Sequence, residues 1–163
     1  MACVAYVGSC LSLRACLDLV ATFGCTAVTL VLQPHAPYSG ANNTDIRLPT
    51  PAGVTYLELV GNAATVDAGG ETRHFHVTQL ASLNVTNVTL RSGRADRAEG
   101  EANQALLGGS IFLWNARSFH ASQVTFDSNR AGPRMELGPT THPFGGAIGA
   151  NLGAGSFFGL DDC

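Results

Sequence analysis

Hydrophobic residues follow two kinds of pattern along the chain, and these predict one helix among many short strands. Over residues 11–23 the apolar positions have the i, i+3, i+4, i+7 spacing of one helical face, and Gly24 is placed to end the helix. Elsewhere, short runs rich in β-branched and aromatic residues alternate with Gly, Pro, Asn and Asp. These runs predict strands at residues 3–7, 25–32, 45–48, 54–60, 64–67, 74–78, 83–90, 110–114, 118–120, 123–126, 147–150 and 156–160.

An internal repeat connects the patterns in the second half of the chain. Residues 81–95 (ASLNVTNVTLRSGRA) align with residues 117–131 (RSFHASQVTFDSNRA), 117 − 81 = 36 positions later. GGSI at 108–111 recurs as GGAI at 145–148, 145 − 108 = 37 positions later. Such a repeat is typical of a solenoid, in which equivalent side chains stack from turn to turn, whereas an antiparallel sandwich has no reason to repeat. The sequence therefore predicts an all-β solenoid of parallel strands.

One domain is expected over residues 1–163, with a strand and capping helix at 1–24 and coils at 25–163. When residues 153–163 are aligned with 115–125, 153 − 115 = 38 positions apart, the chain stops partway through a turn of the predicted solenoid. We therefore expect it to be a fragment that continues into further coils. Inserts at 96–107 and 132–144 follow the same repeat position, so they would form either a binding surface over one face or tolerated insertions.

The repeat also assigns structural roles to individual residues. Asn129 is expected at a tight corner, with left-handed backbone and hydrogen bonds to neighbouring main chain, and Gly145 and Gly146 are expected to allow close packing. The predicted core contains Val85, Val88, Leu90, Ile111, Leu113, Val124, Phe126 and Ile148.

The segments at 26–40 (TAVTLVLQPHAPYSG) and 66–75 (VDAGGETRHF), with the GGAI and Phe-x-x-Asn units, resemble right-handed parallel β-helix proteins of the pectin-lyase-like superfamily. The GGAI and FxxN pair resembles repeats of chlamydial polymorphic outer membrane proteins, although the earlier FxxN copy is LRSG at 90–93. The resemblance implies a right-handed parallel β-helix with an N-terminal capping α-helix. It also implies a non-catalytic structural or adhesive module of a cell-surface or secreted protein, with carbohydrate or a cell-surface protein as partner. The alternative is a carbohydrate-active enzyme, similar to a polysaccharide lyase or glycoside hydrolase, or an inactive relative.

Composition supports β structure and excludes some partners. The 19 glycines and the charged share of only 13% describe a turn-rich chain with few of the charged residues that stabilise surface helices. A net charge of −3 and the lack of a basic cluster argue against nucleic acid, because phosphate binding needs concentrated Lys and Arg. The longest apolar run is too short for a transmembrane segment.

Cysteines and sequons bear on the cellular compartment. Four of the five cysteines cluster near the N-terminus, which predicts either a disulfide-stapled cap in an oxidising compartment or small buried hydrophobic residues, with one cysteine left over. Sequons at 42–44, 84–86 and 87–89 would accept glycans in an exported chain, while Met1 is followed by no basic segment of a signal peptide. Together with the resemblance, this favours an extracellular or cell-surface location. The cysteines are Cys3, Cys10, Cys16, Cys25 and Cys163.

Candidate chemistry is sparse. His74 and His76 alternate with apolar residues, so both are expected on the outer face of a strand, as metal ligands or as solvent-facing histidines. Spacing identifies no further ligands, and the sequence predicts no catalytic, cofactor-binding or metal site. We assign the four candidate carboxylates to corners and turns. These are Asp67, Asp127, Asp161 and Asp162.

Overall fold

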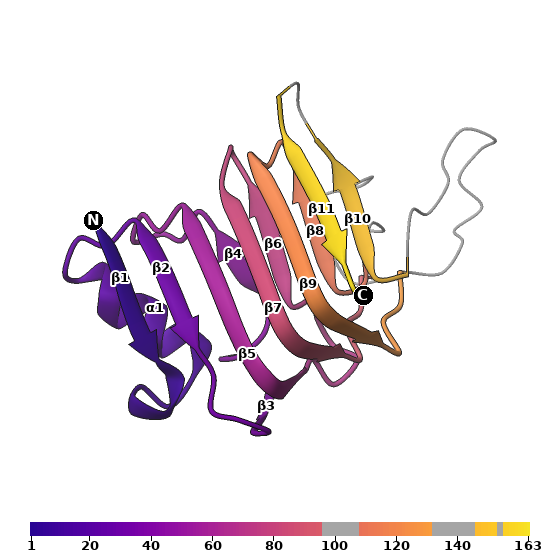
Figure 1. The fold of residues 1–163 in the computed structure, drawn as a ribbon, viewed down its shortest axis with the longest axis horizontal. Coiled ribbons are helices and arrows are strands. Elements are labelled where there is room, and N and C mark those ends of the chain that lie inside the picture. Colours follow the sequence, from indigo (N-terminus) through magenta and orange to yellow (C-terminus); the bar gives the residue numbers. More distant parts are fainter. Residues whose placement is uncertain (96–107, 132–145, 153–154) are drawn as a thin grey trace.

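The computed structural model describes residues 1–95, 108–131, 146–152 and 155–163 (Figure 1). Within these ranges the chain is mainly strands, with one α-helix and one short 3-10 helix near the N-terminus. The elements in order are β1 (Ala2–Tyr6), η1 (Val7–Ser9), α1 (Leu13–Ala21), β2 (Ala27–Val31), β3 (Pro37–Ser39), β4 (Ile46–Leu48), β5 (Tyr56–Asp67), β6 (Phe75–Thr78), β7 (Ser82–Arg91), β8 (Ile111–Trp114), β9 (Ser118–Asp127), β10 (Ile148–Asn151) and β11 (Phe157–Asp161).

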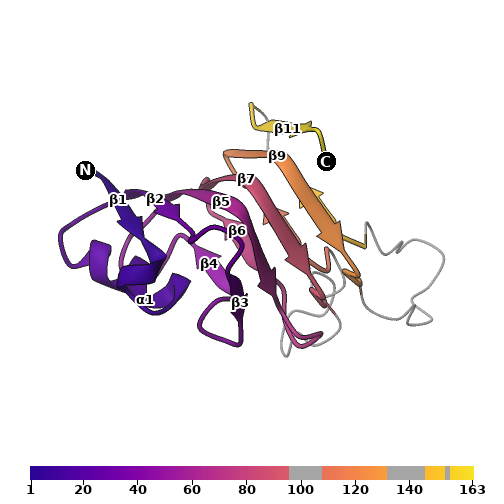
Figure 2. The ribbon, with the colours of Figure 1, turned by 60° about the horizontal axis from the view of Figure 1, so that its bottom comes forward.

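The described strands form two parallel sheets. The larger sheet has the order β1-β2-β5-β7-β9-β11, and β3 pairs with the second half of β5. The smaller sheet has the order β10-β8-β6-β4. Figures 1 and 2 show the smaller sheet beside one face of the larger sheet, and α1 beside β1 and β2. Because parallel neighbours cannot be joined by a tight hairpin, the chain leaves the larger sheet between its strands and returns to it.

This architecture corrects the predicted all-β, right-handed parallel β-helix with a capping helix. The structure is a parallel α/β sheet fold, with two parallel sheets and a helix whose apolar side belongs to the core. The prediction extended a solenoid, inferred from the repeat in the second half of the chain, to residues 25–163. The sequence displacements between paired positions of neighbouring strands in the larger sheet are instead unequal: 27 − 2 = 25, 56 − 27 = 29, 82 − 56 = 26, 118 − 82 = 36 and 157 − 118 = 39. The repeat thus describes one pair of neighbours in each sheet and does not set the class of the fold.

Where the repeat is strongest, it predicts strand register well. β7 and β9 pair from Ser82↔Ser118 onward, and β8 and β10 pair as Ile111↔Ile148, as the displacements of 36 and 37 predict. The alignment of residues 153–163 with residues 115–125, at a displacement of 38, is wrong by one residue. In the structure β11 pairs with β9 at a displacement of 157 − 118 = 39. Phe158 therefore lies over Phe119, with ring centroids 5.4 Å apart, because a shift of one residue exchanges the two faces of a strand.

Local sequence signals explain where the N-terminal helix begins and ends. The Oγ atom of Ser12 accepts a hydrogen bond from the Ala15 N–H at 3.1 Å and so caps α1. Beyond the helix, Gly24 has the left-handed φ of 73° that glycine adopts without strain.

Two disulfides join the four cysteines clustered near the N-terminus. The sequence left open whether these cysteines form disulfides or are small buried hydrophobic residues, and the structure shows disulfides. The pairs are Cys3–Cys25 and Cys10–Cys16, while Cys163 is free and exposed.

Between the sheets lies an apolar core built from alternate residues of the strands. Aligned positions continue it from strand to strand, as in the row Leu30, Leu59, Val85 and Ala121, whose members are all fully buried. Most of the predicted core is buried, namely Val85, Val88, Leu90, Ile111, Leu113 and Val124. Phe126 and Ile148 are only partly buried and pack against it.

Asn129 forms the predicted main-chain hydrogen bonds. Its Nδ2 donates to the Leu90 carbonyl oxygen at 2.8 Å, and its Oδ1 accepts from the Gly93 N–H at 2.7 Å. The left-handed backbone falls on Ser128 instead, with φ 55°. Gly146 approaches Asn129 closely, since an added Cβ would lie 3.3 Å from the Asn129 carbonyl oxygen. The predictions for Gly145 and for both inserts, 96–107 and 132–144, fall outside the described residues.

Candidate functional site

The outer face of the larger sheet carries polar side chains at matching positions of neighbouring strands. One such set, which we call the polar row, crosses β2, β5, β7 and β9. All its members are half-buried, and neighbouring parallel strands are about 4.8 Å apart, so hydrogen-bonding groups recur at a regular step. The polar row consists of Thr29, Glu58, Asn84 and His120.

Hydrogen bonds hold these side chains in place. Thr29 Oγ1 donates to Glu58 Oε2 at 2.8 Å, and Asn84 Nδ2 donates to the Tyr56 hydroxyl at 3.0 Å. At the far end of the row, His120 Nε2 lies 2.8 Å from an Asp161 carboxylate oxygen. The polar row is thus arranged before any ligand arrives.

Tyr56 stays a neutral phenol on this face at physiological pH. Burial raises its pKa above the ordinary value, and the nearby Glu58 carboxylate raises it further, while the hydrogen bond from Asn84 opposes the shift. Since the Tyr56 oxygen accepts from Asn84, its O–H proton remains able to donate to a ligand.

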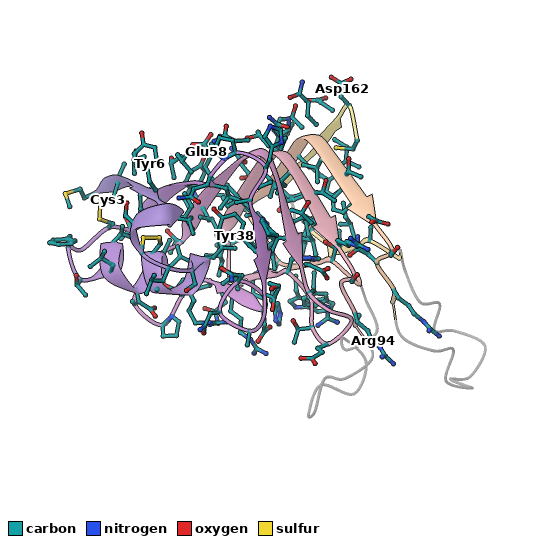
Figure 3. All side chains as sticks on the ribbon, turned by 90° about the horizontal axis from the view of Figure 1, so that it is seen from below. Cys3, Tyr6, Tyr38, Glu58, Arg94 and Asp162 are labelled. Atoms are coloured by element: carbon teal, nitrogen blue, oxygen red, sulfur yellow. A yellow bond between two sulfur atoms is a disulfide. The ribbon has the colours of Figure 1, made fainter. Side chains whose placement is uncertain are left out.

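Exposed aromatic side chains lie on the two edge strands of the larger sheet. Tyr6 at the end of β1 is 63% exposed, and Phe157 at the start of β11 is 59% exposed. Figure 3 shows Tyr6 and Glu58 extending from the same margin of the sheet. The outer face therefore combines flat apolar rings with fixed hydrogen-bonding groups.

A second row, which we call the charged row, crosses the second halves of β5, β7 and β9. It aligns Asp67, Arg91 and Asp127. Arg91 Nε lies 3.5 Å from an Asp127 carboxylate oxygen and 4.0 Å from an Asp67 carboxylate oxygen. Both carboxylates are also held near their turns, because Asp67 accepts from the Gly69 N–H at 2.8 Å and Asp127 accepts from the Ser128 hydroxyl at 2.7 Å. The predicted turn role is therefore observed for Asp67, and the convergence of both carboxylates on Arg91 is a feature that the prediction missed.

The two acidic residues near the end of the chain lie apart from the charged row. Asp161 pairs with His120, whereas Asp162 is exposed and has a left-handed φ of 52°. The repeat alignment contained a signal for both rows, because it places Arg91 beside Asp127 and Asn84 beside His120.

His74 is not on the outer face as predicted. It precedes β6, is fully buried, and places Nε2 2.9 Å from the Val66 carbonyl oxygen and Nδ1 2.9 Å from Ser110 Oγ. A carbonyl can only accept, so Nε2 carries the proton and Nδ1 accepts from the Ser110 hydroxyl. Burial lowers the pKa of His74 to about 4, although its main-chain hydrogen bonds act in the opposite direction. The expected strand alternation fails here because the strand begins one residue later.

His76 is half-buried and contacts Phe112 edge-on, with ring centroids 4.7 Å apart. The two histidines therefore do not share a face. In the part of the chain that the structure describes, no group of three or more His, Cys, Asp or Glu side chains is placed to hold a metal ion.

A cleft of about 380 Å3 lies between α1 and the region around β4. Arg14 lines it, but its guanidinium donates to the Thr44 and Asp45 carbonyl oxygens at 2.9 and 3.1 Å. This arginine therefore holds the segment that precedes β4, and the cleft offers less fixed polar chemistry than the outer face.

The outer face can hydrogen-bond and stack against a ligand, which is the chemistry of recognition. Among the described residues, no helix is long and apolar enough to cross a membrane. Comparisons of the chain with family models, curated proteins and solved structures found no match, so its resemblance to the pectin-lyase-like superfamily and to chlamydial polymorphic outer membrane proteins stays a prediction.

Proposed function

We propose that this chain is a non-catalytic, structural or adhesive module of a cell-surface or secreted protein, and that it contacts its partner through the outer face of the larger sheet. The polar row supports this proposal most directly. Four neighbouring strands present hydrogen-bonding side chains in register, and hydrogen bonds already fix several of them. Binding to such a face costs little side-chain entropy, which is the advantage of a preorganised site.

Carbohydrate is the partner class that suits this face best. Sugar rings combine hydroxyl groups with flat apolar faces, and the outer face offers the Tyr56 hydroxyl and the exposed rings of Tyr6 and Phe157. Neutral glycans fit better than acidic ones, because the face carries carboxylates and the chain has a net charge of −3.

The disulfides support a location outside the reducing cytosol. Cys3–Cys25 and Cys10–Cys16 join all four cysteines of the N-terminal region. Disulfides form and persist mainly in oxidising compartments. An extracellular or cell-surface location is therefore part of the proposal.

A carbohydrate-active enzyme is the second candidate, and the charged row favours it. Glycoside hydrolysis uses two carboxyl groups, and Asp67 and Asp127 approach Arg91 from its two sides. The carboxylates are 35% and 46% exposed, and each makes a hydrogen bond near its own turn. Their contacts account for them structurally, so binding remains the better-supported function.

Affinity electrophoresis of the oxidised chain tests the binding proposal. Gels contain a neutral galactomannan, a neutral β-glucan or the acidic polygalacturonate, and retardation gives the dissociation constant. We expect a neutral polysaccharide to retard the chain. Asn84→Ala and His120→Ala should each weaken binding about 3- to 10-fold, the effect of losing one hydrogen bond worth about 0.5–1.5 kcal/mol.

Thr125→Ala is the matched control, because Thr125 is exposed on the same sheet but lies outside both rows. It should bind like the unmodified chain. Failure of both neutral polysaccharides to retard the chain, or equal binding by all variants, would contradict the proposal. Release of reducing ends that disappears in Asp127→Asn would favour the enzyme instead.

A further inference from the structure

The three sequons occupy different environments in the fold. Each has the Asn-x-Thr pattern that N-glycosylation requires, and the acceptor residues are Asn42, Asn84 and Asn87. Two disulfides independently indicate a chain suited to a secretory compartment, where such glycans are added. The environment of each asparagine then decides which of the three positions can carry a glycan in the folded protein.

Asn42 is exposed in the turn between β3 and β4. Its main-chain oxygen accepts from the Arg14 N–H at 3.0 Å, while its side chain forms no hydrogen bond to the described residues. Asn43 beside it is buried, and its Oδ1 accepts from the Leu13 N–H at 3.0 Å. The main-chain oxygen of Asn42 and the side chain of Asn43 thus anchor the turn, and Nδ2 of Asn42 remains open to solvent.

Thr44, which completes the first sequon, shows when the modification must occur. It is 2% exposed, and its hydroxyl donates to the Gly40 carbonyl oxygen at 3.3 Å and accepts from Thr72 at 3.1 Å. A transferase that recognises this hydroxyl must therefore act before the turn closes. The finished fold then leaves room for the glycan on the exposed Asn42.

Asn87 lies at the bend between the two halves of β7. It is exposed and has a left-handed φ of 49°, which Asn tolerates better than most residues. Gly61 of β5 packs against its main chain so closely that an added Cβ would overlap the Asn87 carbonyl oxygen. The main chain is held in place, and the side chain, which bonds to none of the described residues, is open to solvent.

Asn84 has the opposite environment. It is half-buried within the polar row, and its Nδ2 donates to the Tyr56 hydroxyl at 3.0 Å. A glycan attaches to this same nitrogen, so it would crowd Tyr56 and the aligned Glu58 and His120. The fold disfavours a glycan at this position.

We infer that Asn42 and Asn87 are N-glycosylation sites of this protein, and that the folded, secreted chain carries no glycan at Asn84. A lipid-diphosphate-linked oligosaccharide is the donor, and an oligosaccharyltransferase of the secretory pathway is the catalyst. Asparagine Nδ2 bonds to the anomeric carbon as the bond from that carbon to the lipid diphosphate breaks. The lipid diphosphate leaves with the electron pair, and one amide proton passes to a base of the transferase.

The experiment expresses the full chain behind a secretion signal in cultured eukaryotic cells. Glycopeptides are mapped by mass spectrometry in both the secreted and the cell-retained protein, with and without peptide-N-glycosidase. We expect glycans at Asn42 and Asn87 in the secreted protein and none at Asn84. Asn42→Gln and Asn87→Gln should each remove one glycan.

Asn84→Gln is the matched control and should leave the glycan number unchanged. Because the cell-retained protein is also mapped, a chain that is poorly secreted still gives a result. Glycan on the secreted protein at Asn84, or no glycan at Asn42 and Asn87 in either fraction, overturns the inference. Polysaccharide binding is measured on unglycosylated protein, so failure of that assay and failure of this one are distinguishable.

Discussion

Lowering the pH should destabilise the fold through His74. The side chain is fully buried, and burial lowers its pKa to about 4, compared with about 6.5 in an unfolded chain. Between these values the unfolded chain binds a proton that the folded chain excludes. The free energy of unfolding should therefore be unaffected by this group above about pH 6.5 and should fall as the pH drops toward 4.

The size of the effect follows from the difference between the two pKa values. A pKa difference of about 2.5, at about 1.4 kcal/mol per pH unit, gives a loss of about 3 to 4 kcal/mol once the pH is below both values. At pH 5 the loss is about 2 kcal/mol, because the unfolded chain is then almost fully protonated at this position. Domains are commonly stable by about 5–15 kcal/mol, so the loss is a large share of the total.

Urea unfolding of the oxidised chain at pH 7.5, 6 and 5 measures this loss. The unmodified chain is compared with His74→Gln, whose amide can still donate toward the Val66 carbonyl oxygen but does not titrate. His35→Asn is the control, because His35 is exposed and Asn tolerates its left-handed φ of 55°. Between pH 7.5 and 5, the unmodified chain and His35→Asn should each lose about 2 kcal/mol more than His74→Gln.

Parallel curves for the unmodified chain and His74→Gln would refute the reasoning. If His74→Gln is too unstable to compare, an NMR titration of His74 in the unmodified chain decides the matter. A measured pKa near 6.5 would show that the folded state accommodates the charged ring and that burial carries no penalty.

Three further predictions concern stability in urea. Asn129→Ala should cost about 1–3 kcal/mol, because two main-chain groups lose their bonded partner; a change below about 0.5 kcal/mol would contradict this role. Gly109→Ala should lower the free energy of unfolding by at least about 2 kcal/mol, since its Cβ would lie 2.5 Å from the Arg130 main chain. Gly69→Ala should lower it by about 1 kcal/mol, from its φ of 63° alone. A larger loss for Gly69→Ala than for Gly109→Ala would be inconsistent with close packing at Gly109. Replacing the Cys3–Cys25 disulfide, whose sequence separation is 22, by two alanines should lower the free energy of unfolding by about 3.4 kcal/mol. Replacing Cys10–Cys16, whose separation is 6, should lower it by about 2.2 kcal/mol. Equal losses would argue against loop entropy as the cause.

Local strand structure and much of the core could be predicted because the responsible signals are local. Alternating apolar residues mark β7, and the repeat places Ser82 beside Ser118. The same signals cannot show that the predicted strands at 54–60 and 64–67 form one strand, β5, bent at Asn62 and Ala63. That bend is made by left-handed residues, which apolar spacing does not report.

The class of the fold and the rows of the candidate site depend on distant contacts. Register between β5 and its neighbours decides that Asp67 meets Arg91, and nothing within either segment specifies it. The burial of His74 likewise depends on Ser110 and Val66, which surround it from other parts of the chain. Such features depend on where each crossover returns the chain to its sheet, and a single repeat length does not determine this.

The unequal displacements along the larger sheet have a consequence for redesign. Neighbouring strands are parallel both where the displacement between paired positions is 82 − 56 = 26, as for β5 and β7, and where it is 157 − 118 = 39, as for β9 and β11. The fold therefore tolerates added length in a crossover far better than a one-residue slip within a strand, which would turn every side chain of that strand to the other face. Peptides grafted between strands should leave the outer face of the larger sheet unaltered, while a single deletion inside β7 should disrupt the polar row.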